Sequence, residues 1–276
     1  MTEHTVGRAL DAARRIFASA GVEEPLRDAR RLLGHRIGQA RLLDAEEALG
    51  ADEAVAFEQD IASRAARQPV SQIIGSREFW GRTFSVTSDV LDPRPDTETL
   101  VECALAGPAP VRILDLGTGS GAILLTLLSE WQSATGVGSD LSKAALEVAA
   151  RNAEALGLTN RATLLLSDWW DRIDGTFDLV VSNPPYISEN AMPGLAPEVR
   201  LWEPRMALSP GGDGLDAYRR IADDLSTYLA VGGRALFEIG ADQGESVPLL
   251  FERSGFATVK LHTDLNKKPR VVEVFH

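Results

Sequence analysis

The spacing of apolar residues changes twice along this chain. Up to about residue 70 they recur every three or four positions, as in the stripe Leu10, Ala13 and Phe17, which is typical of an amphipathic helix. A second stripe follows Pro25, a residue that suits the first turn of a helix, and a third follows later. We therefore predict a small helix bundle in residues 1–70. We expect it to recognise the substrate, with a purely stabilising cap as the alternative.

Residues 71–90 have a shorter period. The segments Glu78–Trp80 and Thr83–Thr87 flank a turn at Gly81-Arg82. This pattern predicts a β-hairpin that links the bundle to the rest of the chain.

From residue 91 to residue 276 predicted strands alternate with predicted helices. This alternation predicts an α/β domain with a mainly parallel sheet and helices on both faces. Asp96 or Thr97 is expected to cap the helix Glu98–Leu105. The expected strands are 111–115, 134–139, 162–167, 177–182, 233–239, 256–262 and 270–275, and the helices lie near 122–131, 142–156, 215–229 and 244–254.

Composition excludes several classes of protein. The net charge of −12 and the presence of only four lysines argue against free DNA or RNA as the direct substrate, because phosphate binding needs clustered basic side chains. Cys103 is the only cysteine, so no internal disulfide can form. The four histidines are scattered and form no Cys/His cluster, so we predict no metal site.

The expected location is the cytoplasm. No apolar run approaches the roughly 18–20 residues that span a bilayer, so we expect no membrane association. The start of the chain lacks both the basic and the apolar segment of a secretory signal.

A glycine-rich turn follows the first strand of the α/β domain. Gly117, Gly119 and Gly121 alternate with Thr118 and Ser120, so the backbone can approach a ligand where a Cβ atom would collide. The helix that begins next offers free N–H groups at the same place. The sequence therefore predicts a cofactor-binding turn.

Asp140 comes at the end of the second strand, where a carboxylate can accept hydrogen bonds from ribose hydroxyls. Gly117, Gly119 and Ala122 also satisfy the dinucleotide fingerprint, so a nicotinamide-binding protein stays open at this point. Asp115, two residues before the first glycine, argues against this alternative.

The segment Asn183-Pro184-Pro185-Tyr186 follows the buried strand Phe177–Ser182 and carries the main chemical signal. Two successive prolines hold the Asn183 side chain and the Pro184 carbonyl rigid and provide no N–H groups. Two oxygens presented together can accept both hydrogens of a planar amino group, and a neighbouring aromatic ring can pack against it. An ordinary turn after a strand is the alternative.

The glycine turn and the Asn-Pro-Pro-Tyr segment together resemble class I S-adenosylmethionine methyltransferases that modify amino groups on planar systems. Nearly the whole chain resembles one family among them, the HemK/PrmC glutamine N5-methyltransferases of peptide chain release factors. Asp92 departs from the family pattern, which usually has an aliphatic residue before Pro93. The resemblance rests on the helical N-terminal segment, Asp140, and the motifs Gln68–Gly75, Pro93–Glu98, Asp115–Gly121, Ser167–Trp169, Asn183–Tyr186, Glu203–Leu208 and Gly211–Leu215.

The resemblance implies a seven-stranded Rossmann-like sheet whose last strand is antiparallel, behind a small helix bundle. It implies S-adenosyl-L-methionine as cofactor and, as substrate, the glutamine of the Gly-Gly-Gln loop in class 1 release factors. We expect a monomer. Alternatives are amino methylation of adenine or of a ribosomal protein, a nicotinamide-binding protein and a catalytically silent binding module.

The expected residue roles follow from these motifs. Asn183, Pro184 and Tyr186 are the predicted catalytic residues, and Pro185 joins them in binding the acceptor. Asp168 and Trp169 are expected at the adenine ring, with Trp170 either beside them or in the core. The remaining predicted cofactor residues are Asp115, Gly117, Thr118, Gly119, Ser120, Gly121, Asp140 and Asn183. Arg94, Thr97, Glu98, Glu203 and Arg205 lie in family motifs but could equally form loop ion pairs.

Overall fold

The computed structural model describes residues 5–276 and divides the chain into two compact units. The first unit contains the residues up to Ser76 together with Leu195–Trp202. The second contains Arg77–Gly194 and Glu203–His276. A short segment from the C-terminal two thirds of the sequence therefore packs with the N-terminal helices, which apolar spacing alone does not predict. No helix formed by residues 5–276 is both long and apolar enough to cross a membrane.

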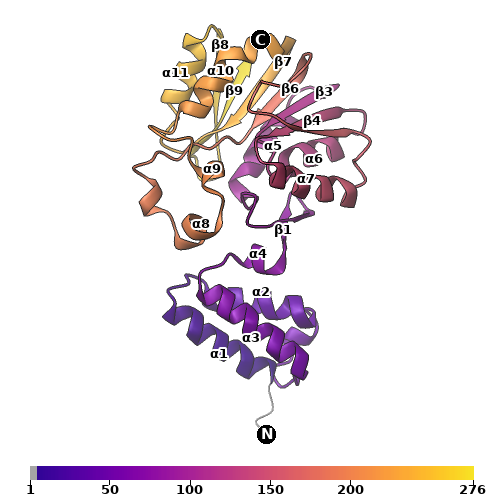
Figure 1. Ribbon diagram of the computed structural model, residues 1–276, viewed down its shortest axis with the longest axis vertical. Helices are drawn as coiled ribbons and strands as arrows, with labels where there is room; N and C mark the ends of the chain where they lie inside the picture. The colour runs from indigo at the N-terminus through magenta and orange to yellow at the C-terminus, as the bar shows by residue number, and fades with distance from the viewer. Residues whose placement is uncertain (1–4) are drawn as a thin grey trace. The chain divides into compact units, whose positions relative to one another are not determined.

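The first unit is a helix bundle, as predicted (Figure 1). Its core is built from the apolar stripes, with Phe17, Leu32, Leu33 and Phe57 almost completely buried. The elements are α1 (Val6–Ser19), α2 (Pro25–Ile37), the 3-10 turn η1 (Arg41–Leu43), α3 (Ala51–Ala65), α4 (Val70–Ile74) and α8 (Pro197–Trp202).

Helix α8 joins this unit through polar contacts. Glu198 accepts hydrogen bonds from Arg64 at 2.9 Å and from Arg67 at 2.7 and 2.8 Å. The indole N–H of Trp202 donates to the Ala66 carbonyl at 3.2 Å, and the Trp202 carbonyl accepts from Gln72 at 3.1 Å. Side-chain charges thus hold a segment that is too short to form a stable helix by itself.

A two-stranded sheet follows the bundle. It pairs β1 (Ser76–Phe79) with β2 (Arg82–Ser85), and Trp80 and Gly81 form the turn. Both turn residues have positive φ, 50° and 68°. Strand β2 ends at Ser85, two residues before the predicted end of the hairpin at Thr87.

The second unit contains a seven-stranded sheet of order β5-β4-β3-β6-β7-β9-β8. The last strand, β9, runs antiparallel to both of its neighbours, as the resemblance implied. The strands are β3 (Arg112–Leu116), β4 (Thr135–Asp140), β5 (Ala162–Leu166), β6 (Phe177–Ser182), β7 (Leu229–Glu238), β8 (Thr258–Thr263) and β9 (Pro269–Phe275). The helices are α5 (Glu98–Leu105), α6 (Ala122–Glu130), α7 (Lys143–Ala155), α9 (Arg205–Leu208), α10 (Asp216–Tyr228) and α11 (Ser246–Arg253), with 3-10 turns η2 (Pro95–Thr97) and η3 (Met192–Gly194).

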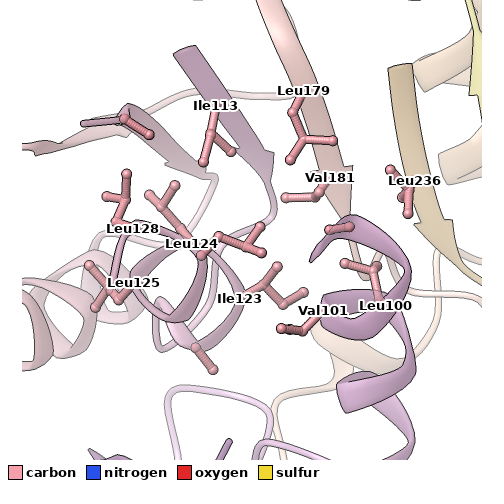
Figure 2. Close-up of a cluster of buried hydrophobic side chains, with 14 of the residues drawn as sticks. Leu100, Val101, Ile113, Ile123, Leu124, Leu125, Leu128, Leu179, Val181 and Leu236 are labelled. Carbon is pink, nitrogen blue, oxygen red and sulfur yellow. The ribbon is translucent and has the colours of Figure 1, made fainter. Parts of the chain in front are cut away.

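Alternate residues of each central strand face opposite layers of helices. On β6, Leu179 and Val181 face one cluster and Val180 faces the other. Figure 2 shows the first cluster, in which Leu179 and Val181 of β6 lie in one group with Leu100 of α5 and Ile123 of α6. Helices α10 and α11 cover the opposite face. Because helices cover both faces of the sheet, a site can form only at the ends of its strands or along its edge strands.

The predicted side-chain cap of α5 is wrong. Thr97 occupies the N-cap position, but neither its hydroxyl nor another side chain caps the helix. The short turn η2 leads into α5 instead, and the Thr97 hydroxyl has other partners, described below. Helix α7 does have a side-chain cap, since Ser142 Oγ accepts from the backbone N–H of Ala145 at 3.2 Å.

Candidate active site

One cavity of about 340 Å³ opens at the carboxyl ends of the parallel strands, and all of its walls belong to the second unit. Strands β3, β4, β5 and β6 each end at this edge of the sheet, so residues far apart in the sequence meet there. The predicted residues in its walls are Gly117, Thr118, Gly119, Ser120, Asp140, Asp168, Trp169, Asn183 and Pro185.

Four predicted residues lie outside the cavity wall. Asp115 is completely buried beneath the glycine turn, and Gly121 faces α6 and α7. Pro184 and Tyr186 flank the wall residue Pro185 in sequence without lining the cavity by their own surface. Their predicted roles therefore depend on backbone atoms or on packing behind the wall.

The glycine turn is shaped for a ligand that lies against the backbone. Gly117 and Gly119 have φ of 69° and 55°, and a Cβ atom at either position would meet nothing within 4 Å. A side chain there would project into the cavity. The backbone N–H of Thr118 donates to the Ser139 carbonyl at 2.9 Å and holds the turn against β4.

Asp115 braces the turn from below. Its Oδ2 accepts from the Thr118 hydroxyl at 2.7 Å, while its buried Oδ1 has no hydrogen-bond partner. Burial raises the pKa of Asp115 to about 7, although the hydrogen bonds that it accepts oppose this shift. Its role in binding the cofactor remains a prediction.

Asp140 connects the turn to the start of the next helix. Its Oδ2 accepts from the Gly119 N–H at 2.9 Å and its Oδ1 from the Ser142 N–H at 2.8 Å. Burial raises its pKa, and these backbone donors oppose the shift. Each carboxylate oxygen can accept a further hydrogen bond, so the predicted ribose contact is compatible with this geometry.

Trp169 reaches the cavity from a strained backbone position. Its φ of 50° is uncommon for a residue with a side chain, and the Ser167 hydroxyl holds it by donating to the Trp169 carbonyl at 3.0 Å. Asp168 pairs with Arg220 of α10 at 2.9 Å. Trp170 belongs to the core, where its ring stacks on Tyr228 with centroids 4.7 Å apart.

Asn183 is held by a residue from a different part of the sequence. Its Nδ2 donates to Thr97 Oγ1 at 3.2 Å. Burial raises the pKa of the Glu238 carboxylate at the end of β7 to about 7, and a hydrogen bond from the Thr97 hydroxyl opposes this shift. The amide nitrogen of Asn183 therefore faces α5, and both Asn183 and Thr97 line the cavity.

The backbone of Tyr186 is fixed from behind by a second family motif. Gln243 Nε2 donates to the Tyr186 carbonyl at 3.1 Å. Gly214 has φ of 83°, and a Cβ atom there would lie 2.4 Å from the same carbonyl oxygen. Only glycine fits at position 214 without displacing the loop. Burial raises the pKa of the Tyr186 hydroxyl to about 12, so it stays protonated at neutral pH.

The weaker motif residues form loop contacts. Arg94 pairs with Glu203 at 2.6 and 2.7 Å, and Arg205 pairs with Glu189 at 2.5 Å. Glu98 accepts from the Trp80 backbone N–H at 2.8 Å. Burial raises the pKa of Glu203 to about 7 even though Arg94 opposes this effect.

Sequence reasoning missed Glu238 and Arg220. Glu238 is a carboxylate that directly follows the apolar run Ala235–Phe237 at the end of a strand, and that position alone could have singled it out. Arg220 lies on a helix whose pattern is ordinary, so no signal indicated its pairing with Asp168.

The residues of the cavity fit S-adenosylmethionine. The two open glycine positions leave room for a ligand against the backbone, and a carboxylate and an indole ring stand at the ends of the next two strands. Apolar wall residues such as Leu141 and Met206 add surface for the uncharged parts of such a molecule.

Comparison with known proteins identifies the family. The N-terminal domain model of PrmC matches residues 8–75, and the methyltransferase small domain model matches residues 88–214. The release factor glutamine methyltransferase of Cereibacter sphaeroides is 55% identical over 96% of this chain and 97% of its own. That of Rhodospirillum rubrum is 46% identical over 96% of this chain and 83% of its own. This chain belongs to the release factor glutamine methyltransferase family.

Solved structures of lower identity share the fold. A methyltransferase from Pyrococcus furiosus superposes with a TM-score of 0.54 at 14% identity and covers 82% of this chain and 98% of its own. A Thermus thermophilus 16S rRNA methyltransferase, solved with AdoMet and guanosine, gives 0.54 at 20% identity over 72% of this chain and 49% of its own. These likenesses agree with the class I methyltransferase sheet described above.

Proposed function

We propose that this protein transfers a methyl group from S-adenosyl-L-methionine to the side-chain amide nitrogen of a glutamine. The acceptor is the glutamine of the Gly-Gly-Gln motif in class 1 peptide chain release factors. One observation carries the proposal: Asn183 and the glycine turn line the same cavity, in a chain of the release factor glutamine methyltransferase family. The location that fits this substrate is the cytoplasm.

The chemical problem is the poor nucleophilicity of a carboxamide nitrogen, whose lone pair is delocalised into the carbonyl group. When bound, S-adenosylmethionine supplies an electrophilic methyl group. Asn183 Oδ1 accepts one N–H of the glutamine, and the Pro184 carbonyl accepts the other. These two fixed acceptors align the nitrogen and favour the positive charge that develops on it.

The proton leaves after methyl transfer, to water or a nearby carbonyl. Loss of a proton from the neutral amide before transfer would be prohibitive at neutral pH. Four carboxylates line the cavity, and each already has a partner. Asp140 accepts from backbone N–H groups, Asp168 and Asp216 pair with Arg220 and Arg219, and Asp89 accepts from the Thr87 hydroxyl. This arrangement is consistent with late proton loss.

The first unit has a separate role in this proposal, that of binding the release factor. The cavity and all of its wall residues lie in the second unit, so the helix bundle contributes no chemistry. Its match to the PrmC N-terminal domain model supports this assignment.

The decisive experiment combines the purified protein, a class 1 release factor and S-adenosylmethionine labelled on the methyl group, followed by mass mapping of the peptides. Label is expected on the glutamine of the Gly-Gly-Gln motif. A release factor with alanine at that glutamine is the matched substrate control and should stay unlabelled. Label on a lysine, or on a nucleic acid only, would overturn the proposal.

A further inference from the structure

Three polar side chains, Asn183, Thr97 and Glu238, follow one another next to the place proposed for the methyl acceptor. Asn183 Nδ2 donates to Thr97 Oγ1 at 3.2 Å, and the effect of Thr97 on the pKa of Glu238 places its hydroxyl within reach of that carboxylate. Thr97 is 5% exposed and Glu238 is 1% exposed. Both side chains are therefore almost completely removed from bulk solvent.

The fold explains why a carboxylate stands at this place. On β7, Leu236 and Glu238 point to the face covered by α5, while Phe237 points to the opposite face. Ser182 of β6 pairs with Phe237 in the parallel register, so the next residues of the two strands, Asn183 and Glu238, are neighbours. Thr97 precedes α5 and lies between them.

The direction of the hydrogen bonds follows from the chemistry of a hydroxyl group, which has a single proton. If Thr97 donates that proton to Glu238, its oxygen can only accept from Asn183. The Asn183 amide must then turn its NH2 group to Thr97, and Oδ1 is left for the cavity. The two orientations of an asparagine amide are almost identical in shape, so packing alone does not select between them.

We propose that Thr97, oriented by Glu238, is a positioning residue that selects the amide orientation in which Asn183 Oδ1 faces the methyl acceptor. In the reversed orientation an NH2 group would meet the NH2 group of the acceptor, and neither could accept a hydrogen bond. This inference rests on the proposed function for its kinetic consequence. It also explains why the Thr97 hydroxyl does not cap α5.

The test compares three variants of the full chain. Thr97→Val keeps the shape but removes the hydroxyl, Thr97→Ser keeps the hydroxyl, and Thr126→Val is the matched control. Thr126 is another completely buried threonine, on α6, and its hydroxyl has no hydrogen-bond partner. The same substitution there removes no interaction.

With a release factor as substrate, Thr97→Val is expected to lower kcat roughly tenfold, because the Asn183 NH2 group loses its partner and the amide populates both orientations. KM for the release factor and the affinity for S-adenosylhomocysteine should stay within about twofold, since neither depends on the amide orientation. Thr97→Ser should restore kcat to within about threefold and Thr126→Val should leave it unchanged. Equal kcat in Thr97→Val and wild type, or equal losses in Thr97→Val and Thr97→Ser, would overturn the inference.

A second measurement does not depend on the substrate. The side-chain NH2 signal of Asn183, assigned by its disappearance in Asn183→Ala, should exchange slowly with solvent in wild type and Thr126→Val and much faster in Thr97→Val. Unchanged exchange in Thr97→Val would refute the positioning role even if kcat fell. If the wild-type protein does not methylate the release factor but the exchange rates of wild type and Thr97→Val still differ, the proposed function is overturned and the positioning role is retained.

Discussion

Glu198 in the helix bundle and two carboxylates of the large sheet, Asp115 and Glu238, differ in how the burial of their charge is compensated. In the helix bundle, burial would raise the pKa of Glu198, but hydrogen bonds from Arg67 and Arg64 outweigh it and the pKa lies below its ordinary value. At the edge of the large sheet, burial dominates instead and raises the pKa of Asp115 and Glu238 to about 7. Each of these two carboxylates has a buried oxygen without a hydrogen-bond partner.

This difference indicates which carboxylates stabilise the folded protein and which reduce its stability. The Glu198 network is satisfied and joins a distant segment to the bundle, so its charges serve the fold. Under-satisfied buried carboxylates are unfavourable for folding and tend to occur where a site requires a particular arrangement. Four changes test this contrast, from the largest expected effect to the smallest.

Asn183→Ala should lower kcat by roughly 10²–10³, by analogy with the loss of one oxyanion-hole donor. Binding of S-adenosylhomocysteine, measured by calorimetry, should be nearly unaffected because the glycine turn is intact. Asn190→Ala is the control, since Asn190 is exposed on the same loop and should tolerate the change. Parallel losses of affinity and turnover in Asn183→Ala would contradict the assigned role.

Asp140→Ala should weaken cofactor binding by about tenfold to more than a hundredfold, because hydrogen bonds to a charged acceptor contribute about 1.5–3 kcal/mol. The change removes the expected ribose contacts and also the acceptor for the Gly119 N–H. Titration with S-adenosylhomocysteine measures the effect. Asp174→Ala removes the same charge from an exposed position and should not alter the affinity, so an equal loss there would assign the effect to net charge.

Glu198→Gln should destabilise the attachment of α8 to the bundle by about 1–3 kcal/mol, since the hydrogen bonds from Arg64 and Arg67 lose their charge assistance and one acceptor oxygen becomes an NH2 donor. Amide hydrogen exchange in α8 reports this directly. Glu189→Gln removes a partner of Arg205 from an exposed pair and should cost no more than about 1 kcal/mol. Equal effects in the two variants would remove the contrast between buried and exposed pairs.

Asp115→Asn should change how stability depends on pH. Because the folded protein holds the Asp115 proton up to about pH 7, its contribution is fully present below the unfolded pKa and is lost as pH rises through the folded pKa. Between about pH 5 and 7, wild-type unfolding free energy should therefore fall by up to about 1.4 kcal/mol per pH unit for this group. The unfolding free energy, measured by urea titration at several pH values, should depend less steeply on pH in Asp115→Asn than in wild type. Equal pH dependence in the two proteins would mean that Asp115 is ionised throughout.

Much of the architecture could be predicted from local patterns. The predicted strands 162–167 and 177–182 differ from β5 and β6 by at most one residue, because runs of apolar residues end where turn residues begin. The cavity walls were also predictable, since strand ends in an open parallel sheet converge on one edge. The absence of a side-chain cap on α5 was not predictable, because Thr97 has a tertiary hydrogen-bond partner that competes with the local one.

The sequence by itself determined the alternation of elements, the glycine turn and the Asn-Pro-Pro-Tyr loop, because each depends on neighbours within a few residues. Tertiary structure alone decided which atoms of that loop face the cavity. Asn183, Thr97 and Glu238 are separated by scores of residues, and only the strand order and register bring them together. The same applies to α8, whose Glu198 finds its partners more than a hundred residues away. Such pairings depend on three-dimensional distance, on which hydrophobic periodicity carries no information.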